Sequence, residues 1–183
     1  IMIVPWAIPL PVAAILWKLM LDPMFGILNT FGLKLGLLKN AVNFLGDPRI
    51  ALWSVIAFAV WKGFSLTLVM LTSGLETIPE EVNEAATLDG VTSWSRLVFI
   101  TMPLLKPVWL VTLLLEMIWT IKEFGVVYLP ASGGPNYATS VLSVFIYQSS
   151  FTKLRFGEAS AAGVLLLLVS LIGTVIYLRL LQR

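Results

Sequence analysis

The chain contains neither cysteine nor histidine, and it carries little charge. Without these two residue types it has no disulfide, no thiol nucleophile, no imidazole base and none of the commonest metal ligands. We therefore expect no catalytic residue, no metal site and no cofactor held by this chain. Charged residues make up 12% of the 183, about half the usual share of a soluble domain. The net charge of +2 is too small to indicate a nucleic-acid partner.

Long apolar runs are what the sequence has instead, with 58% hydrophobic residues and a mean hydropathy of +0.94. A helix needs about 20 apolar residues to cross a hydrocarbon layer about 30 Å thick. Segments 1–21, 50–74, 107–129 and 158–180 meet this length. The sequence therefore predicts an all-α membrane protein with about four transmembrane helices within residues 1–183.

The first apolar segment contains Pro5, Pro9 and Pro11. These prolines predict a kinked helix whose freed carbonyls are covered by neighbouring helices. The chain opens at Ile1, inside this apolar segment and with no basic leader. We expect that upstream sequence is missing.

A polar insert, residues 75–106, separates the second and third apolar segments. Thr77 and Glu80 have the spacing of a capping box at a helix start. That helix is expected to run to Leu88 or Asp89 and to stop at Gly90, which suits a left-handed turn.

A second helix of the insert is expected to begin at Thr92 or Ser93 and to end at Pro103. On the first helix, Ala85 and Ala86 share a face on which a foreign surface can approach closely, with the Glu84 charge beside them. We interpret the insert as a docking element for a partner protein.

The insert resembles the signature of the permease subunits of binding-protein-dependent ABC importers. Glu84-Ala85-Ala86 is followed after three residues by Gly90, then after nine by Ile100, and Met102-Pro103 completes the pattern. The family has Leu where this chain has Met102, a swap that conserves volume. Other segments resemble the carbohydrate-uptake branch, of the maltose type: Pro5-Trp6-Ala7-Ile8-Pro9, Trp61-Lys62-Gly63-Phe64, Gly74-Leu75-Glu76-Thr77-Ile78-Pro79, and Gly133-Gly134-Pro135 with Thr139.

This resemblance implies an ABC type I importer helical bundle with a cytoplasmic coupling-helix hairpin, as a multi-pass protein of the cell inner membrane. Segments 22–49 and 130–157 would face an extracytoplasmic solute-binding protein. The other partners implied are a second permease subunit, the lipid bilayer, and an ABC ATPase dimer that binds ATP and Mg. Further crossings would lie upstream of Ile1. The implied ATPase-coupling residues are Glu84, Ala85, Ala86, Asp89, Gly90, Ile100 and Pro103.

The distribution of Lys and Arg does not determine which side of the membrane each connection faces. The connections 22–49 and 130–157 carry five Lys and Arg residues and the opposite side carries four, so the positive-inside rule does not favour either side.

Several charges fall inside the expected crossings, where each costs about 2.5–3.5 kcal/mol and faces the bundle interior or a wet cavity. Glu116, Trp119 and Glu123 follow one face of the third crossing, and carboxylates beside an aromatic ring suit a sugar. Lys62 and Trp61 of the second crossing complete the expected substrate pathway. Two alternatives remain open: Lys62 pairs with Glu116, or Lys122 and Glu123 reach the headgroups.

The expected function is translocation of a sugar or related solute. A permease for another solute, such as glycerol phosphate or a polyamine, is the alternative within the same class. An intramembrane enzyme would need an activated nucleophile, for which the sequence offers only paired carboxylates or a Ser with a Lys, such as Ser65 and Lys62, three residues apart. A passive channel would leave the capped insert unexplained. The chain also lacks a Gly-x-x-x-x-Gly-Lys-Ser/Thr loop, so ATP hydrolysis would belong to another subunit.

Overall fold

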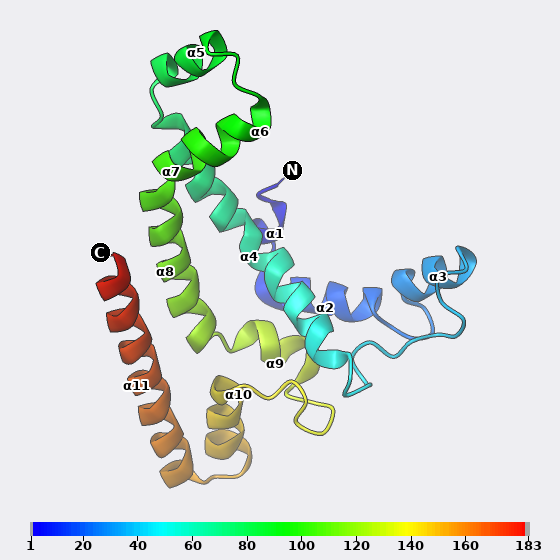
Figure 1. Ribbon diagram of the computed structural model, residues 1–183. Helices are drawn as coiled ribbons and strands as arrows, with labels where there is room; N and C mark the ends of the chain where they lie inside the picture. The colour runs from blue at the N-terminus through cyan, green and yellow to red at the C-terminus, as the bar shows by residue number, and fades with distance from the viewer. Residues whose placement is uncertain (1, 182–183) are drawn as a thin grey trace.

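A computed structural model describes residues 2–181, and these residues fold into helices and their connections (Figure 1). Ile1, Gln182 and Arg183 lie outside the described part. The helices are α1 (Val4–Ala7), α2 (Leu10–Met20), α3 (Ile27–Lys34), α4 (Ala51–Glu76), α5 (Glu80–Leu88), α6 (Ser93–Arg96), α7 (Met102–Leu104), α8 (Lys106–Lys122), α9 (Gly125–Ala131), α10 (Leu142–Tyr147) and α11 (Phe156–Leu181). Two π-helical segments, η1 (Leu97–Thr101) and η2 (Gln148–Thr152), follow α6 and α10.

Two of the four expected crossings are single long helices. α4 and α11 are both long and apolar enough to cross a membrane. The helices Ser93–Leu104 and Lys106–Lys122 reach that standard only as a pair, with a bend of 68° between them. Segment 1–21 holds α1 and the shorter apolar helix α2. The number of crossings remains a prediction.

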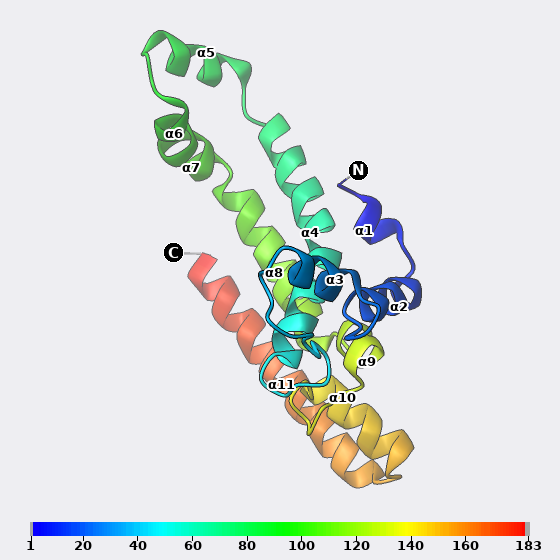
Figure 2. The ribbon, with the colours of Figure 1, turned by 90° about the vertical axis from the view of Figure 1, so that its right-hand side faces the viewer.

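The polar insert forms a helical hairpin at one end of the molecule, and α10 lies at the opposite end (Figures 1 and 2). α5 ends at Leu88 as expected, and Gly90 has φ +68°, the left-handed turn that glycine permits. Thr92 caps α6, its hydroxyl accepting from the amide of Ser95 at 3.3 Å.

The expected capping box is wrong. The Thr77 hydroxyl donates to the carbonyl of Gly74 at 2.7 Å, and α5 begins after Pro79 with no side-chain cap from the described residues. The reason is that α4 continues to Glu76, so Thr77 closes the end of α4. The acidic residues of the first turn, Glu80 and Glu81, are then what stabilises the positive N-terminal end of the α5 dipole.

Pro103 was expected to end the second helix of the insert, and this is also wrong. The helix continues through Pro103 to Leu104 and bends at Leu105, just before α8 begins at Lys106. Pro103 has no N–H for the carbonyl of Phe99, four residues earlier. The backbone accommodates this gap by widening into the π-helical segment η1 just before the proline.

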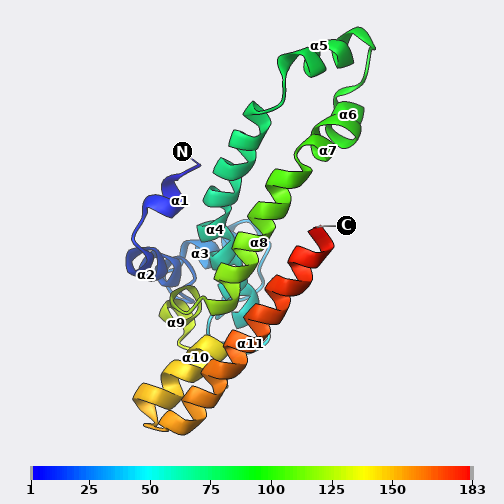
Figure 3. The same ribbon diagram turned by 90° about the vertical axis from the view of Figure 1, so that its left-hand side faces the viewer.

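α8 lies between α4 and α11 in Figure 3. A Cβ added to Gly74 would come within 2.8 Å of Val108, so this glycine lets α4 and α8 approach closely. A buried apolar cluster lies between α2, α4 and α9, where Ala13, Ala14, Phe58 and Val126 are buried. These contacts hold α4 against α2 and α9 near Phe58 and against α8 near Gly74.

Candidate functional site: a cavity between α4, α8 and α9

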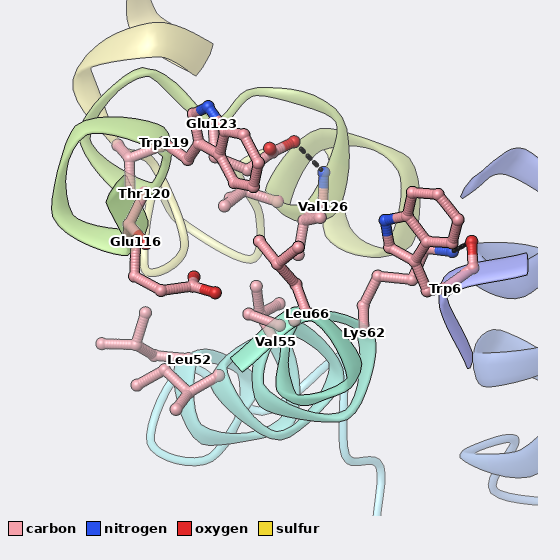
Figure 4. A pocket seen from close by; sticks show the side chains of 15 residues that line it. Trp6, Leu52, Val55, Lys62, Leu66, Glu116, Trp119, Thr120, Glu123 and Val126 are labelled. Carbon is pink, nitrogen blue, oxygen red and sulfur yellow. Dashed lines mark hydrogen bonds between the residues drawn. The ribbon is translucent and has the colours of Figure 1, made fainter. Parts of the chain in front are cut away.

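A cavity of about 380 Å³ opens between α4 and the α8–α9 segment (Figure 4). Four of the five residues expected along the substrate pathway line it: Lys62, Glu116, Trp119 and Glu123. Lys62 comes from α4, Glu116 and Trp119 come from α8, and Glu123 is the residue that follows α8. The remaining lining residues are Trp6, Leu52, Val55, Ile56, Ala59, Gly63, Leu66, Thr120, Val126, Val127 and Val141.

Glu116 is half-buried in the wall that α8 contributes. Its Oε1 accepts a hydrogen bond from the Thr67 hydroxyl of α4 at 3.0 Å. The other carboxylate oxygen faces Gly63, 3.9 Å from the position of a Cβ there. Glu116 therefore bridges two helices through one oxygen and keeps acceptor capacity for a bound molecule.

Glu123 occupies the break between α8 and α9, where its backbone is extended (φ −65°, ψ 125°). Its Oε1 accepts from the amide of Val126 at 3.1 Å, and the Ser143 hydroxyl donates to its carbonyl at 2.7 Å. The carboxylate thus satisfies an open N–H at the start of α9 and is held in the cavity wall. Of the two side chains expected to reach the headgroups, Glu123 lines the cavity and Lys122 is exposed.

Two indoles supply the aromatic surface of the cavity. Trp119 comes from α8 and Trp6 from α1, and their exposed fractions are 46% and 64%. Figure 4 shows them on either side of the cavity. Exposed rings beside carboxylates offer flat apolar faces next to strong hydrogen-bond acceptors.

Trp61, also expected along the pathway, does not line the cavity. It stacks on Trp17 and Phe58, with ring centroids 6.0 and 6.1 Å apart. The Trp17 indole donates to the carbonyl of Ser54 at 3.1 Å, so this face of α4 packs against α2. Helical spacing puts Trp61 on the same side of α4 as Ser54 and Phe58, but spacing alone does not tell which neighbouring helix that side contacts.

Lys62 does not pair with Glu116. Among the described residues, the one ion pair joins Arg155 and Glu158 at 3.2 Å. The Lys62 ammonium instead donates to the carbonyls of Pro5, Trp6 and Ile8, at 2.5, 3.2 and 2.5 Å.

Ser65 is buried, and its hydroxyl donates to the carbonyl of Met2 at 2.8 Å. Both members of the suggested Ser–Lys pair are thus bonded to backbone carbonyls rather than to each other. The nucleophile-and-base contact that covalent catalysis requires is not formed by Lys62 and Ser65, both within the described residues.

Sequence reasoning missed several lining residues because they come from separate parts of the chain. Trp6, Val126 and Val141 are far apart in sequence and meet only in the tertiary fold. Pro9 was the available signal near Trp6, since a proline interrupts a helix and makes a single helical periodicity unreliable across segment 1–21.

The second candidate region is the hairpin of α5, α6 and α7. Glu84, Ala85, Asp89 and Gly90 are exposed, whereas Ala86 is only 3% exposed. Ala85, and not Ala86, is therefore the alanine that a partner surface can approach closely.

The two arms of the hairpin are joined by the Arg96 guanidinium, which donates to the Thr87 hydroxyl at 2.8 Å. Farther along, Ile100 is half-buried in η1 and Pro103 is exposed in α7.

Comparison with known proteins gives a family match over the whole chain. The family described as "Binding-protein-dependent transport system inner membrane component" matches residues 1–183. The trehalose/maltose transport system permease protein MalF of Thermococcus litoralis is 34% identical over 179 residues, covering 98% of this chain and 60% of MalF. The sulfoquinovosyl glycerol transport system permease protein SmoG of Agrobacterium fabrum is 31% identical, covering 99% of this chain and 58% of SmoG.

The fold is also found among solved structures. A bacterial ABC transporter involved in the import of the acidic polysaccharide alginate matches with a TM-score of 0.89 and 24% identity, covering 98% of this chain and 63% of that one. This likeness shows a shared all-helical importer permease fold. The chain spans about three fifths of the length of the relatives that it matches.

Proposed function

Because the chain belongs to the binding-protein-dependent transport system inner membrane component family, we propose that it is the membrane-spanning permease of an ATP-driven sugar importer. The observation that carries the proposal is the cavity, where two carboxylates and two indoles face a common space. Carboxylate oxygens accept hydrogen bonds from hydroxyls, and indoles pack against the C–H face of a sugar ring. Two relatives that cover nearly the whole chain are named for carbohydrate-containing solutes.

Energy and delivery would come from partner chains. We propose that an ATPase dimer, which binds ATP and Mg, docks on the hairpin of α5, α6 and α7. A second permease subunit would complete the bundle, and an extracytoplasmic binding protein would deliver the solute to the end near α10. The chain would pass several times through the inner membrane, with α4 and α11 as two of its crossings.

We propose that the hairpin transmits ATP-driven movement to the two walls of the cavity. α4 and α8 both line the cavity and both connect to the hairpin. Movement of the hairpin by the ATPases would therefore change the separation of the two walls and expose the cavity to alternate sides of the membrane.

A polyamine permease is the second candidate, because Glu116 and Glu123 would also suit a cationic solute. The two candidates differ in the role of Trp119. A sugar needs the indole as a stacking surface, whereas a polyamine would depend mainly on the two charges. Competition for uptake by maltose-type sugars and by spermidine separates them.

The test measures uptake by the complete transporter in vesicles. Glu123→Gln keeps an oxygen that can accept from the Val126 amide but removes the charge, so the start of α9 stays capped. We expect a loss of about 1.5–3 kcal/mol of solute binding, seen as a rise of roughly 10- to 150-fold in the half-saturating concentration. Trp119→Ala should show a similar rise.

Trp53→Ala is the matched control, since Trp53 is an exposed tryptophan of α4 that does not line the cavity. Its uptake should equal that of the unaltered chain. Unchanged half-saturation in both Glu123→Gln and Trp119→Ala would overturn the placement of the solute in this cavity.

A further inference from the structure

The break between α1 and α2 leaves backbone carbonyls without their usual helical donors. Pro9 has no N–H for the carbonyl of Pro5, four residues earlier. The backbone at Ile8 is extended (φ −72°, ψ 128°), so the helical ladder does not continue from α1 into α2. The carbonyls of Pro5, Trp6 and Ile8 therefore point out of the regular hydrogen-bond pattern, in an apolar region where unpaired groups are costly.

One side chain, that of Lys62, donates hydrogen bonds to all three carbonyls. The Lys62 ammonium has three donors, and each of these carbonyls accepts from it. One turn later on α4, the Ser65 hydroxyl donates a hydrogen bond to the carbonyl of Met2 at 2.8 Å. The bonds join residues more than 50 positions apart, so they are tertiary contacts and not local helix caps. We call the hydrogen bonds from Lys62 and Ser65 to this N-terminal segment the fastening.

The fastened segment carries part of the cavity wall. Trp6 lies between the carbonyls that Lys62 holds, and its indole lines the cavity (Figure 4). Glu116 does not need Lys62 as a partner, because Thr67 donates to it.

We propose that Lys62 is a positioning residue: its ammonium fastens the broken N-terminal segment to α4 and thereby places Trp6 in the wall of the solute cavity. The solute is bound by the carboxylates and indoles, and Lys62 acts on it through Trp6. This rests on the proposed function for its effect on transport, but the fastening itself does not.

The first experiment tests the fastening without any solute. The chain has no cysteine, so Trp6→Cys in a complex with cysteine-free partner chains gives a single reporter thiol. Its rate of reaction with a water-soluble maleimide is measured with Lys62, with Lys62→Met and with Lys62→Arg. Methionine keeps a long apolar stem without donors, and arginine keeps charged donors.

We expect Lys62→Met to change the labelling rate by roughly tenfold, the change that about 1.4 kcal/mol of altered positioning free energy produces. Lys62→Arg should stay close to the unaltered rate. If Lys62→Met prevents assembly, Ser65→Ala is measured in the same way and should change the rate in the same direction. Equal labelling with and without the fastening bonds would overturn the proposal.

The second experiment measures sugar uptake in a double-mutant cycle of Lys62→Met and Trp6→Ala. Each single change should raise the half-saturating concentration while leaving the maximal rate within about twofold, and the double variant should be no worse than Trp6→Ala alone. Additive effects would mean that Lys62 binds the solute directly, and would overturn the positioning role. If the unaltered complex transports no sugar while labelling still depends on Lys62, the proposed function fails and the fastening stands.

Discussion

At the residue scale, two glycines with positive φ differ in what they connect. Gly90 (φ +68°) joins the arms of the hairpin, and Gly36 (φ +70°) follows α3. No described atom lies within 4 Å of a Cβ added at either position, so a substitution meets backbone strain alone. The two sites impose a similar strain in different parts of the molecule.

Under the proposed function, Gly90→Ala should therefore reduce the solute transported per ATP hydrolysed by the complex while leaving assembly intact. The left-handed conformation costs an alanine about 1–2 kcal/mol, which shifts the turn that sets the hairpin geometry. Transport and ATP hydrolysis are measured together in vesicles. Gly36→Ala carries a similar strain outside the hairpin and should keep the ratio unchanged; a normal ratio in Gly90→Ala would contradict the coupling role.

The exposed carboxylate of Glu84 leads to a charge prediction at the same scale. Glu84→Lys reverses a charge beside the exposed Ala85, where a basic partner surface would now be repelled. We expect lower affinity for the isolated ATPase dimer, measured by co-purification at increasing salt. Asn83→Lys, at an exposed neighbouring position, adds charge without removing the carboxylate and should weaken binding less.

At the element scale, the packing of α4 against α8 depends on one small residue. A Cβ on Gly74 would approach Val108 to 2.8 Å and Leu105 to 3.0 Å, where side chains of α8 and its preceding turn already fill the space. Gly163, in α11, has no described atom within 4 Å of its Cβ position. These two helical glycines thus separate close packing from helix propensity.

Gly74→Ala should destabilise the chain by about 1–3 kcal/mol through overpacking. Gly163→Ala should be neutral or slightly stabilising, because alanine is the better helix former. Thermal unfolding of the purified complex in detergent measures both. Equal midpoints for Gly74→Ala and the unaltered complex would show that α4 and α8 do not pack this closely.

Sequence reasoning succeeded at several local signals, although the Thr77–Glu80 capping box was wrong because α4 extends to Glu76. Leu88, Gly90 and Thr92 ended and started helices as predicted, because caps and left-handed turns depend on near neighbours. It failed at Pro103, since the helix that begins at Ser93 runs through this proline and the π-helical segment η1 just before it takes up the missing hydrogen bond.

The candidate site shows the same division. The spacing of Glu116, Trp119 and Glu123 predicted one shared helix face; all three line the cavity, but Glu123 does so from the extended break after α8 and not from the helix. The partners of Lys62 could not be predicted, because they lie across the tertiary fold in α1 and at the break. Trp6 replaces Trp61 in the wall for the same reason: periodicity defines a face without naming its neighbour.

At the scale of the whole molecule, the hairpin and the α10 end lie far apart along the long helices (Figures 1 and 3). Leu88 is 89% exposed on the hairpin, and Phe151 is 70% exposed after α10. Charge counting left the orientation open, but the proposed function requires these two residues on opposite sides of the membrane.

Single-cysteine labelling of intact cells settles the orientation, since the chain has no cysteine of its own. Phe151→Cys should react with a membrane-impermeant maleimide added outside, and Leu88→Cys should react only after the membrane is opened. Both sites are exposed in the chain, so different rates would not reflect burial within the chain itself. The reverse pattern would place the hairpin outside the cell and contradict docking of an ATPase there.

The two walls of the cavity differ in stiffness. α4 is unbroken from Ala51 to Glu76, so the stretch from Lys62 to Glu76, about 21 Å at 1.5 Å per residue, behaves as a strut. α8 has a joint at each end, at Leu105 toward the hairpin and at Glu123 toward α9. Movement of the hairpin would therefore rotate α8 relative to the rigid α4. Trp119 would then move across the opening of the cavity, while Trp6 stays attached to α4.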